Sequence, residues 1–258
     1  MSIRIESREN SLVKRLVRLS NDRKFRKEMQ EMVCEGEKML GEALSSGMDI
    51  HDILLAEDAE LDIALLRQAE GQGAKLYICP SSLLGKVSNV KTPQGVAAVC
   101  AMPPSPAPEE MGNRLILLEN VQDPGNVGTI IRTADAAGLD GVLLSNQCAD
   151  VFSPKVLRAT MGSIFRMNLR TTDDLPGELT KLREKGYSIL SSQLDGTPFY
   201  ERQGVAERFA LIIGNEGNGV SEQVQQTATH RVRLPMRGGA ESLNAAIAAA
   251  IMMYELMR

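Results

Sequence analysis

The sequence is poor in the residues on which metal and nucleophilic chemistry depend. Its 258 residues include only two histidines, His51 and His230, and four cysteines. The cysteines are widely spaced and form no Cys-x-x-Cys pair, which argues against a disulfide framework or a zinc site. Two histidines also argue against a histidine-based metal site or a Ser-His triad. We therefore expect no metal, and a structural or surface role for His230, which precedes a strand in a polar stretch.

Long apolar runs are missing as well. The longest, at residues 245–253, is short for a membrane span and follows a polar loop, so it predicts a buried helix. The first 30 residues are charged and lack the apolar core of a signal peptide. With 43% hydrophobic and 24% charged residues, the composition is typical of a soluble globular protein. We expect a cytoplasmic protein, or an organellar one whose import signal is absent here, with no membrane partner.

An excess of charge of one sign is confined to the N-terminus. The net charge is −4, so the whole chain is no obvious polyanion binder. Residues 1–30, however, hold nine basic and four acidic side chains. Such a segment fits phosphate contacts, although a solvated helix face has the same composition.

A proline-rich stretch divides the chain. Residues 102–111 hold four prolines, which excludes a helix or a central strand and predicts a semi-rigid spacer. We expect a small domain at residues 1–101, a linker at 102–112 and a second domain at 113–258.

Hydrophobic periodicity predicts an alternation of strands and helices in both halves. In the first, strands are expected at 32–34, 53–55, 76–78 and 95–100, and helices at 11–19, 39–44 and 61–69. In the second, strands are expected at 115–118, 141–144, 166–168, 188–191, 209–213 and 231–234, and helices at 127–137, 154–160, 175–184, 221–226 and 243–256. This pattern predicts a small α/β domain followed by a mostly parallel sheet with helices on both faces.

Three segments rich in Gly, Asn and Pro each follow a predicted strand of the second half: residues 120–132, 213–220 and 234–244. Ligands of open α/β sheets bind outside the carboxyl ends of the strands, so these loops predict a shared site. Asn126 is expected to cap a helix whose free N–H groups face a ligand, with Arg132 on the next turns. Glu216 lies in a loop that is neither a Walker A nor a dinucleotide-binding motif. Each segment alone fits a plain turn or helix cap better than a functional loop.

Together, the three segments resemble the motifs of the SpoU/TrmH family of RNA ribose 2′-O-methyltransferases, within the SPOUT superfamily. The matching residues are Asn126, Gly128 and Arg132 in the first motif, Gly214, Glu216, Gly217 and Gly219 in the second, and Pro235, Met236, Ser242, Leu243 and Asn244 in the third. The resemblance covers residues 113–258. A weaker one at residues 33–38 looks like the start of the small substrate-binding domain that many members carry.

The resemblance implies an α/β domain whose C-terminal segment forms a trefoil knot, bound S-adenosylmethionine, and a homodimer joined through the C-terminal domain. The residues it implies for catalysis are Asn126, Arg132, Glu216, Ser242 and Asn244. Those it implies for the cofactor are Ser192, Gly214, Asn215, Gly217, Leu234, Met236 and Leu243. Close packing of the alanine-rich helix after Asn244, within the fold or across a dimer, is compatible with this arrangement.

The implied reaction is attack of a ribose 2′-hydroxyl on the methyl group of the donor. Arginine is a poor general base because its pKa exceeds about 12, so we expect Arg132 to bind the 2′-oxygen or a nearby phosphate. Further phosphate contacts are hypothesised for Arg15, Arg18, Lys155, Arg158 and Arg166. Ribosomal RNA is the expected substrate. Transfer RNA methylation, a non-catalytic RNA-binding or ribosome-assembly factor, and a small-molecule nucleotide enzyme remain alternatives.

Overall fold

The computed structural model describes residues 2–88 and 93–258, which form two compact units. The first unit comprises Met1–Pro103 together with Asp150–Phe165, and the second comprises Pro104–Ala149 and Arg166–Arg258. A segment from the second half of the sequence, Asp150–Phe165, thus packs with the first unit. A domain boundary at the proline-rich stretch alone does not predict this. Within the described ranges, no helix has the length and apolar character needed to cross a membrane.

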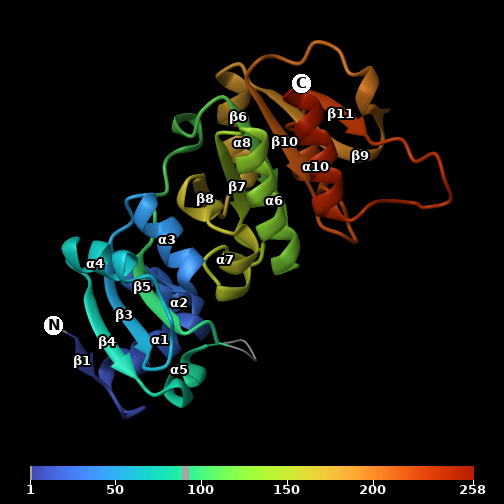
Figure 1. Ribbon diagram of the computed structural model, residues 1–258. Coiled ribbons are helices and arrows are strands. Elements are labelled where there is room, and N and C mark those ends of the chain that lie inside the picture. Colours follow the sequence, from blue (N-terminus) through green and yellow to red (C-terminus); the bar gives the residue numbers. More distant parts are fainter. Residues whose placement is uncertain (1, 89–92) are drawn as a thin grey trace. The chain divides into compact units, whose positions relative to one another are not determined.

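The first unit is a five-stranded mixed sheet with helices on its faces (Figure 1). Its elements are β1 (Ile3–Arg4), α1 (Ser11–Asn21), α2 (Arg23–Met29), β2 (Glu31–Glu35), α3 (Glu37–Ser45), β3 (Ile50–Ala56), α4 (Ile63–Gly71), β4 (Lys75–Cys79), α5 (Ser81–Val87), β5 (Val96–Ala101), α7 (Pro154–Thr160) and the 3-10 turn η2 (Ser163–Phe165). The strand order is β1-β4-β3-β5-β2; β4 runs parallel to β1 and β3, whereas β5 runs antiparallel to β3 and β2.

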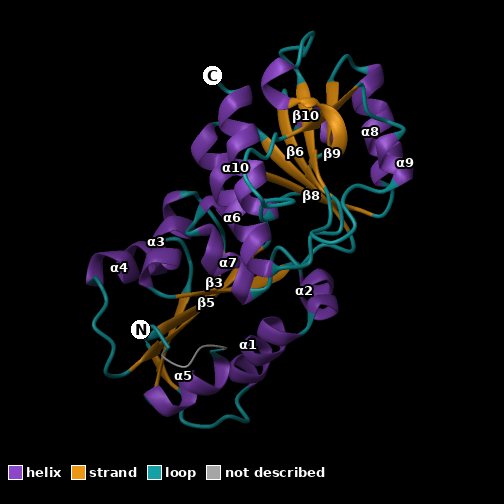
Figure 2. Ribbon diagram, turned by 90° about the vertical axis from the view of Figure 1, so that its right-hand side faces the viewer, coloured by secondary structure: helices purple, strands orange, loops and turns teal. Residues whose placement is uncertain are grey.

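Helical spacing of leucines builds one layer of this core. Asn10 caps α1 by accepting a hydrogen bond from the backbone N–H of Leu12. Leu12, Leu16 and Leu19 recur on one helix face and are buried with side chains of α5, β2, β3 and β5. Figure 2 shows α1 and α5 on one side of the sheet and α3 and α4 on the other.

Ion pairs anchor the segment that the second half contributes to this unit. The α7 helix packs on β2, and Arg158 Nη1 lies 3.2 Å from Glu35 Oε2. Arg26 of α2, whose side chain is 4% exposed, forms an ion pair with Asp150 and donates to the carbonyl of Leu19. Such a buried cation needs both partners, so this segment belongs to the structure of the first unit.

The second unit is a six-stranded, wholly parallel sheet. Its elements are η1 (Pro108–Glu110), β6 (Arg114–Leu118), α6 (Pro124–Ala137), β7 (Gly141–Ser145), β8 (Asn168–Thr172), α8 (Leu175–Glu184), β9 (Ser188–Pro198), η3 (Phe199–Glu201), β10 (Phe209–Ile213), α9 (Glu222–Gln225), β11 (His230–Arg233) and α10 (Ala245–Leu256). The strand order is β11-β9-β10-β6-β7-β8. The predicted parallel sheet is confirmed.

Helices cover both faces of this sheet, as the sequence predicts. Leucines of α8 and Val224 of α9 are buried against β6, β7, β9 and β10, and α6 packs against α10 on the opposite face (Figure 2). Central β6 and β10 are paired in register, with Leu118 opposite Ile213. The loops that leave these two strands therefore start side by side, which places the first two Gly/Asn-rich segments together.

The elements that sequence patterns miss are short or locally capped. The strand β1 and the helices α2 and α5 were not predicted, and β8 starts at Asn168, where the predicted strand ends. The α2 helix has no apolar stripe; its cap comes from Asp22, which accepts from the N–H of Phe25. The predicted spacer is wrong at its end, because Pro108–Glu110 form a 3-10 turn and Met111 is fully buried in the core of the second unit.

Candidate active site

The first Gly/Asn-rich loop starts α6 in an unexpected way. The helix is capped by Asp123, whose Oδ1 accepts a hydrogen bond of 2.8 Å from the backbone N–H of Asn126, and Pro124 occupies the first turn. The prediction that Asn126 caps the helix is therefore wrong. Because Asp123 does the capping, the amide group of Asn126 is free to project from the first turn of the helix.

The side chain of Asn126 joins all three loops. Its Nδ2 donates to Oε1 of Glu216 at 2.9 Å, and its Oδ1 accepts from Nδ2 of Asn244 at 2.9 Å. Oδ1 of Asn244 in turn caps α10, accepting from the N–H groups of Ala246 at 2.9 Å and Ile247 at 3.3 Å. We call these hydrogen bonds between Asn126, Glu216 and Asn244 the amide relay. They can form with only one orientation of each amide group, so the orientations of both asparagine side chains are fixed. Three segments up to 118 residues apart in sequence meet in one chain of hydrogen bonds.

The loop that carries Glu216 is closed on itself. Asn215 pairs with Gly219 in an isolated bridge, and its Oδ1 accepts from the N–H groups of Gly217 and Asn218, both at 3.0 Å. A side chain at Gly214 would overlap the backbone of Gly219, so only glycine fits there. The side-chain amide of Asn215 builds this loop, and the cofactor contact expected for the residue stays a prediction.

Residues that sequence patterns did not single out hold this loop against β6. Asn120 adopts a left-handed conformation with φ 57°, and its carbonyl accepts from Nδ2 of Asn215 at 2.8 Å. Buried Glu119 accepts from the N–H of Ser221 at 2.8 Å and from its hydroxyl at 2.5 Å. The only available signal was their place immediately after a buried strand.

Two of the five predicted catalytic residues stay outside the amide relay. Arg132 is exposed on α6, and six residues of helix turn it about 120° away from Asn126. It makes no ion pair with any residue of the described ranges. Ser242 is exposed in the loop before α10 and likewise has no hydrogen bond to the described part of the chain. The structure thus gathers Asn126, Glu216 and Asn244 and leaves two polar groups available to other molecules.

An open cavity of about 440 Å³ lies beside the third loop. It is lined by Tyr200, Leu234, Pro235, Met236, Arg237, Leu243 and Ile251. Three of the predicted cofactor residues, Leu234, Met236 and Leu243, therefore share one cavity, whereas Ser192, Gly214 and Gly217 do not line it. Its size and its apolar and aromatic walls suit a nucleoside-containing ligand such as S-adenosylmethionine.

Tyr200 and Ile251 are cavity residues that the sequence did not reveal. They lie on the turn after β9 and in the middle of α10, in segments with no distinguishing motif. Leu243, which lines the cavity, directly precedes Asn244, which ends the amide relay. The backbone therefore connects the cavity to the polar side chains over a single peptide bond.

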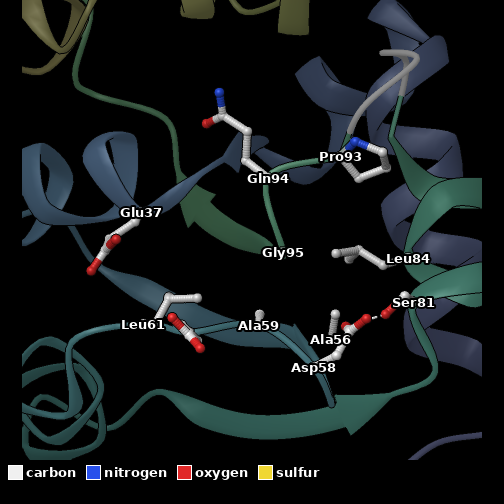
Figure 3. A pocket seen from close by; sticks show the side chains of 11 residues that line it. Glu37, Ala56, Asp58, Ala59, Leu61, Ser81, Leu84, Pro93, Gln94 and Gly95 are labelled. Carbon is white, nitrogen blue, oxygen red and sulfur yellow. Dashed lines mark hydrogen bonds between the residues drawn. The ribbon is translucent and has the colours of Figure 1, made fainter.

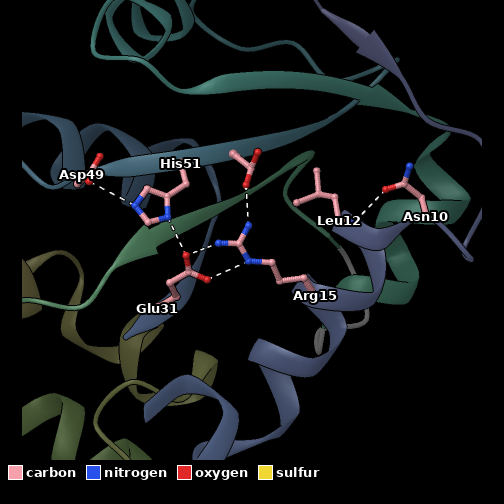
Figure 4. A network of polar contacts seen from close by, with 7 residues as sticks. Asn10, Leu12, Arg15, Glu31, Asp49 and His51 are labelled. Carbon is pink, nitrogen blue, oxygen red and sulfur yellow. Dashed lines mark hydrogen bonds and ion pairs between the residues drawn. The ribbon is translucent and has the colours of Figure 1, made fainter. Parts of the chain in front are cut away.

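Most of the arginines predicted to bind RNA have partners within the chain. Arg15 forms an ion pair with Glu31, which also accepts a contact of 2.8 Å from Nδ1 of His51 (Figure 4). In addition, Nη1 of Arg15 lies 3.0 Å from Asp52. With its guanidinium shared by two buried carboxylates, Arg15 serves the fold of the first unit, and its predicted role as a free phosphate ligand loses support.

The other predicted RNA ligands differ in availability. Arg18 is exposed, lies 3.5 Å from Asp22 and stacks 4.0 Å from the ring centre of Phe25. Arg158 is bound to Glu35, as described above. Lys155 is exposed on α7 and has no ion pair with the described residues, so it is the most available of the four.

The remaining polar candidates also have local partners. Arg166 is paired with Asp135 at 2.8 Å. His230 contacts the hydroxyl of Thr229 at 2.7 Å and the carbonyl of Gln203 at 3.1 Å. Its place among backbone and hydroxyl partners agrees with the structural role expected from the sequence.

Comparison with known proteins decides what this arrangement is. The model of the SpoU rRNA methylase family matches residues 113–254, and that of the MRM3-like substrate binding domain matches residues 10–98. The chain belongs to the SpoU rRNA methylase family. The family expectation drawn from the three motifs is confirmed, as is the α/β fold with a separate N-terminal substrate-binding domain.

Relatives match this SpoU-family chain over nearly its whole length. The 23S rRNA (guanosine(2553)-2′-O)-methyltransferase RlmP of Bacillus subtilis is 36% identical over 98% of both chains. The AdoMet-bound rRNA methyltransferase of Sinorhizobium meliloti is 29% identical, with a TM-score of 0.86 over 98% of this chain and 96% of that one. The SpoU methyltransferase AviRb of Streptomyces viridochromogenes, solved with AdoMet, is 26% identical, with a TM-score of 0.85 over 96% and 97% of the two chains.

Proposed function

We propose that this SpoU-family chain methylates a ribose 2′-hydroxyl of ribosomal RNA with S-adenosylmethionine as the methyl donor. The observation that carries the proposal is the amide relay of Asn126, Glu216 and Asn244, which is joined through Leu243 to the apolar cavity. Relatives aligned over nearly the whole chain are named as rRNA methyltransferases, and two were solved with AdoMet. The proposal therefore rests on the family, on the amide relay for the ribose and on the cavity for the cofactor.

Leu234, Met236 and Leu243 would hold the cofactor against the cavity wall. Bound S-adenosylmethionine supplies an electrophilic methyl group, so the protein has no leaving group to activate. Transfer of that methyl group to the 2′-oxygen would release S-adenosylhomocysteine and the hydroxyl proton. The contribution of the chain is to orient the hydroxyl and hold the two centres close.

The amide relay gives each of its members a distinct role. The carboxylate of Glu216 polarises the amide of Asn126, and the N-terminus of α10 fixes that of Asn244. Asn126 then presents a rigid polar surface to the ribose. Arg132 and Ser242, free of partners in the described ranges, would contact the 2′-oxygen or a neighbouring phosphate; guanidinium binding lowers the pKa of the hydroxyl without acting as a base.

An apolar stripe on α10 supports a homodimer formed through the second unit. Ile247, Ile251 and Tyr254 recur at helical spacing and are 52%, 37% and 56% exposed. The opposite face of the same helix, with Ala246, Ala249 and Met253, is buried, so the helix is apolar on both sides. A second copy of this chain is the partner that the resemblance implies, and it would cover the stripe.

The knot and the cytoplasmic location expected from the sequence also remain proposals. Close backbone packing of β9 on β11 supports a threaded C-terminal segment, since a side chain at Gly196 would overlap the backbone of Val232. Methylation of ribosomal RNA takes place where ribosomes assemble, and this supports the cytoplasmic location.

The decisive experiment maps ribose methylation on RNA treated with the purified protein. Transcribed 23S rRNA of Bacillus subtilis and bulk transfer RNA would each be incubated with S-adenosylmethionine, and calorimetry would measure cofactor binding. We expect one new 2′-O-methyl group in the 23S transcript and none in transfer RNA. Cofactor binding without methylation of either RNA would favour a non-catalytic assembly factor, and methylation of transfer RNA alone would overturn the proposed substrate.

A further inference from the structure

A second open cavity, of about 380 Å³, lies wholly within the first unit (Figure 3). It sits where β3 ends and β5 begins, with Ala56 and Gly95 at its base. Gly95 has φ 78°, and a side chain there would collide with Cβ of Ala59, so glycine keeps this space open. None of its lining residues belongs to the site of the second unit.

The walls of this cavity combine flat apolar surface with carboxylates. Figure 3 shows Leu61 on one side and Leu84 and Pro93 on the other, with Glu37 and Asp58 beside them. No Lys or Arg lines it among the described residues. A phosphate is therefore excluded as its ligand, because carboxylates without a cation repel an anion.

A metal ion is not a suitable occupant either. The described residues contain no group of three or more His, Cys, Asp or Glu side chains that could hold one. Asp58 is already bonded to the hydroxyl of Ser81, and Oε1 of Glu37 accepts from the N–H of Asp62 at 2.9 Å. The second carboxylate oxygen of Glu37, whose side chain is held by the bond to Asp62, stays available beside an apolar slot, as do the second oxygen of Asp58 and the carboxylate of Glu60.

We propose that this cavity takes an unpaired guanine base of the RNA substrate, with its Watson–Crick edge toward the carboxylate of Glu37. An RNA ligand follows from the proposed function, on which this assignment rests. Single-stranded bases are recognised by packing of their faces and hydrogen bonding of their edges. Carboxylates only accept hydrogen bonds, and guanine is the base that presents two neighbouring donors, N1–H and the N2 amino group, on that edge.

Exposed lysines flank the lining residues and suit the adjoining phosphates. Lys38 follows Glu37, and Lys86 lies two residues beyond Leu84 on α5. Neither makes an ion pair with the described residues. The cavity would thus read the base, while the surrounding cations bind the backbone without regard to sequence.

The test measures binding of the full-length protein to short oligouridines that carry one central guanosine, inosine, adenosine or cytidine, by fluorescence anisotropy. Inosine keeps N1–H but lacks the N2 amino group. We expect guanosine to bind roughly tenfold more tightly than adenosine or cytidine, and inosine to fall between, because one hydrogen bond to a charged acceptor is lost. Glu37→Gln, which keeps an acceptor for Asp62, should abolish the preference.

Glu28→Gln is the matched control. It removes the same charge from an exposed position of α2 in the same unit, outside the cavity, and should leave the guanosine preference intact. Ala59→Leu, which fills the cavity, should abolish the preference too, with thermal unfolding confirming that the variant is folded.

Absence of guanosine preference in the wild-type protein, including failure to bind any of the oligonucleotides, would overturn the assignment. Retention of the preference by Glu37→Gln would do the same. Methyl transfer is measured separately on 23S rRNA. Loss of methylation with an intact guanosine preference would count against the proposed function, whereas methylation without the preference counts against the cavity.

Discussion

Replacing Asn126 by Asp tests the amide relay with a change of one functional group. The substitution keeps the acceptor for Asn244 but turns the donor that faces Glu216 into a second carboxylate oxygen. At the 2.9 Å now spanned by that hydrogen bond, two unit charges repel by about 1.4 kcal/mol in water and by about 6 kcal/mol at an effective dielectric constant of ~20. Because Glu216 is exposed, we expect a value near the lower limit, about 2 kcal/mol.

If the relay orients the ribose, that energy should appear in catalysis. A loss of about 2 kcal/mol corresponds to a roughly thirtyfold lower kcat/KM. The assay is transfer of labelled methyl groups to 23S rRNA, with cofactor affinity measured by calorimetry. Cofactor affinity should change by less than about threefold, since Leu234, Met236 and Leu243 line a cavity that the substitution leaves alone.

Two controls separate charge repulsion from a general disturbance. Adding Glu216→Gln to Asn126→Asp restores a donor opposite the new carboxylate, and the pair should recover most of the lost rate. Lowering the pH should also help the single variant, because one of two facing carboxylates takes up a proton and becomes a donor. Its deficit relative to wild type should therefore be smaller at about pH 6 than at about pH 8. Wild-type activity of Asn126→Asp, or no recovery in the double variant, would refute the role of the relay.

Four further predictions address other parts of the molecule. Arg132→Lys should lower the methylation rate by at least tenfold with unchanged cofactor affinity, and full activity with unchanged RNA affinity would remove the guanidinium from the mechanism. Arg26→Ala leaves Asp150 without its cation and should lower the unfolding free energy in urea by about 3 kcal/mol, while the double variant lacking both side chains should lose less. Tyr254→Glu should shift the protein from dimer to monomer in light scattering, and a monomeric wild type would contradict the proposed interface. Burial raises the pKa of the Cys148 thiol. Its contribution to stability is therefore fully present below the unfolded pKa of about 8.5 and is lost as pH rises through the folded pKa. The urea midpoint of unfolding should fall above about pH 9, and it should fall less in Cys148→Ala.

The sequence predicted the second unit better than the first. Its strands β6, β7 and β10 are apolar runs buried on both faces, separated by capped helices, and this pattern is typical of a parallel sheet. The short elements of the first unit, such as α2 and α5, carry weaker periodicity, since a helix of seven residues presents only two turns. The packing of Asp150–Phe165 with the first unit depends on pairs such as Arg26 and Asp150, which are 124 residues apart.

For the candidate site, too, local sequence patterns predicted one part and contacts between distant residues decided the rest. The motifs of the three Gly/Asn-rich loops are local patterns, so the sequence alone determined the family and the methyl donor and predicted a site at Asn126, Glu216 and Asn244. Tertiary structure decided what those side chains do. Asp123 took over the cap of α6, which freed the Asn126 amide for Glu216 and Asn244, and Arg15 was neutralised by Glu31 and Asp52. Hydrogen bonds and ion pairs of this kind join residues that are distant in sequence, so only the folded chain determines which donor meets which acceptor.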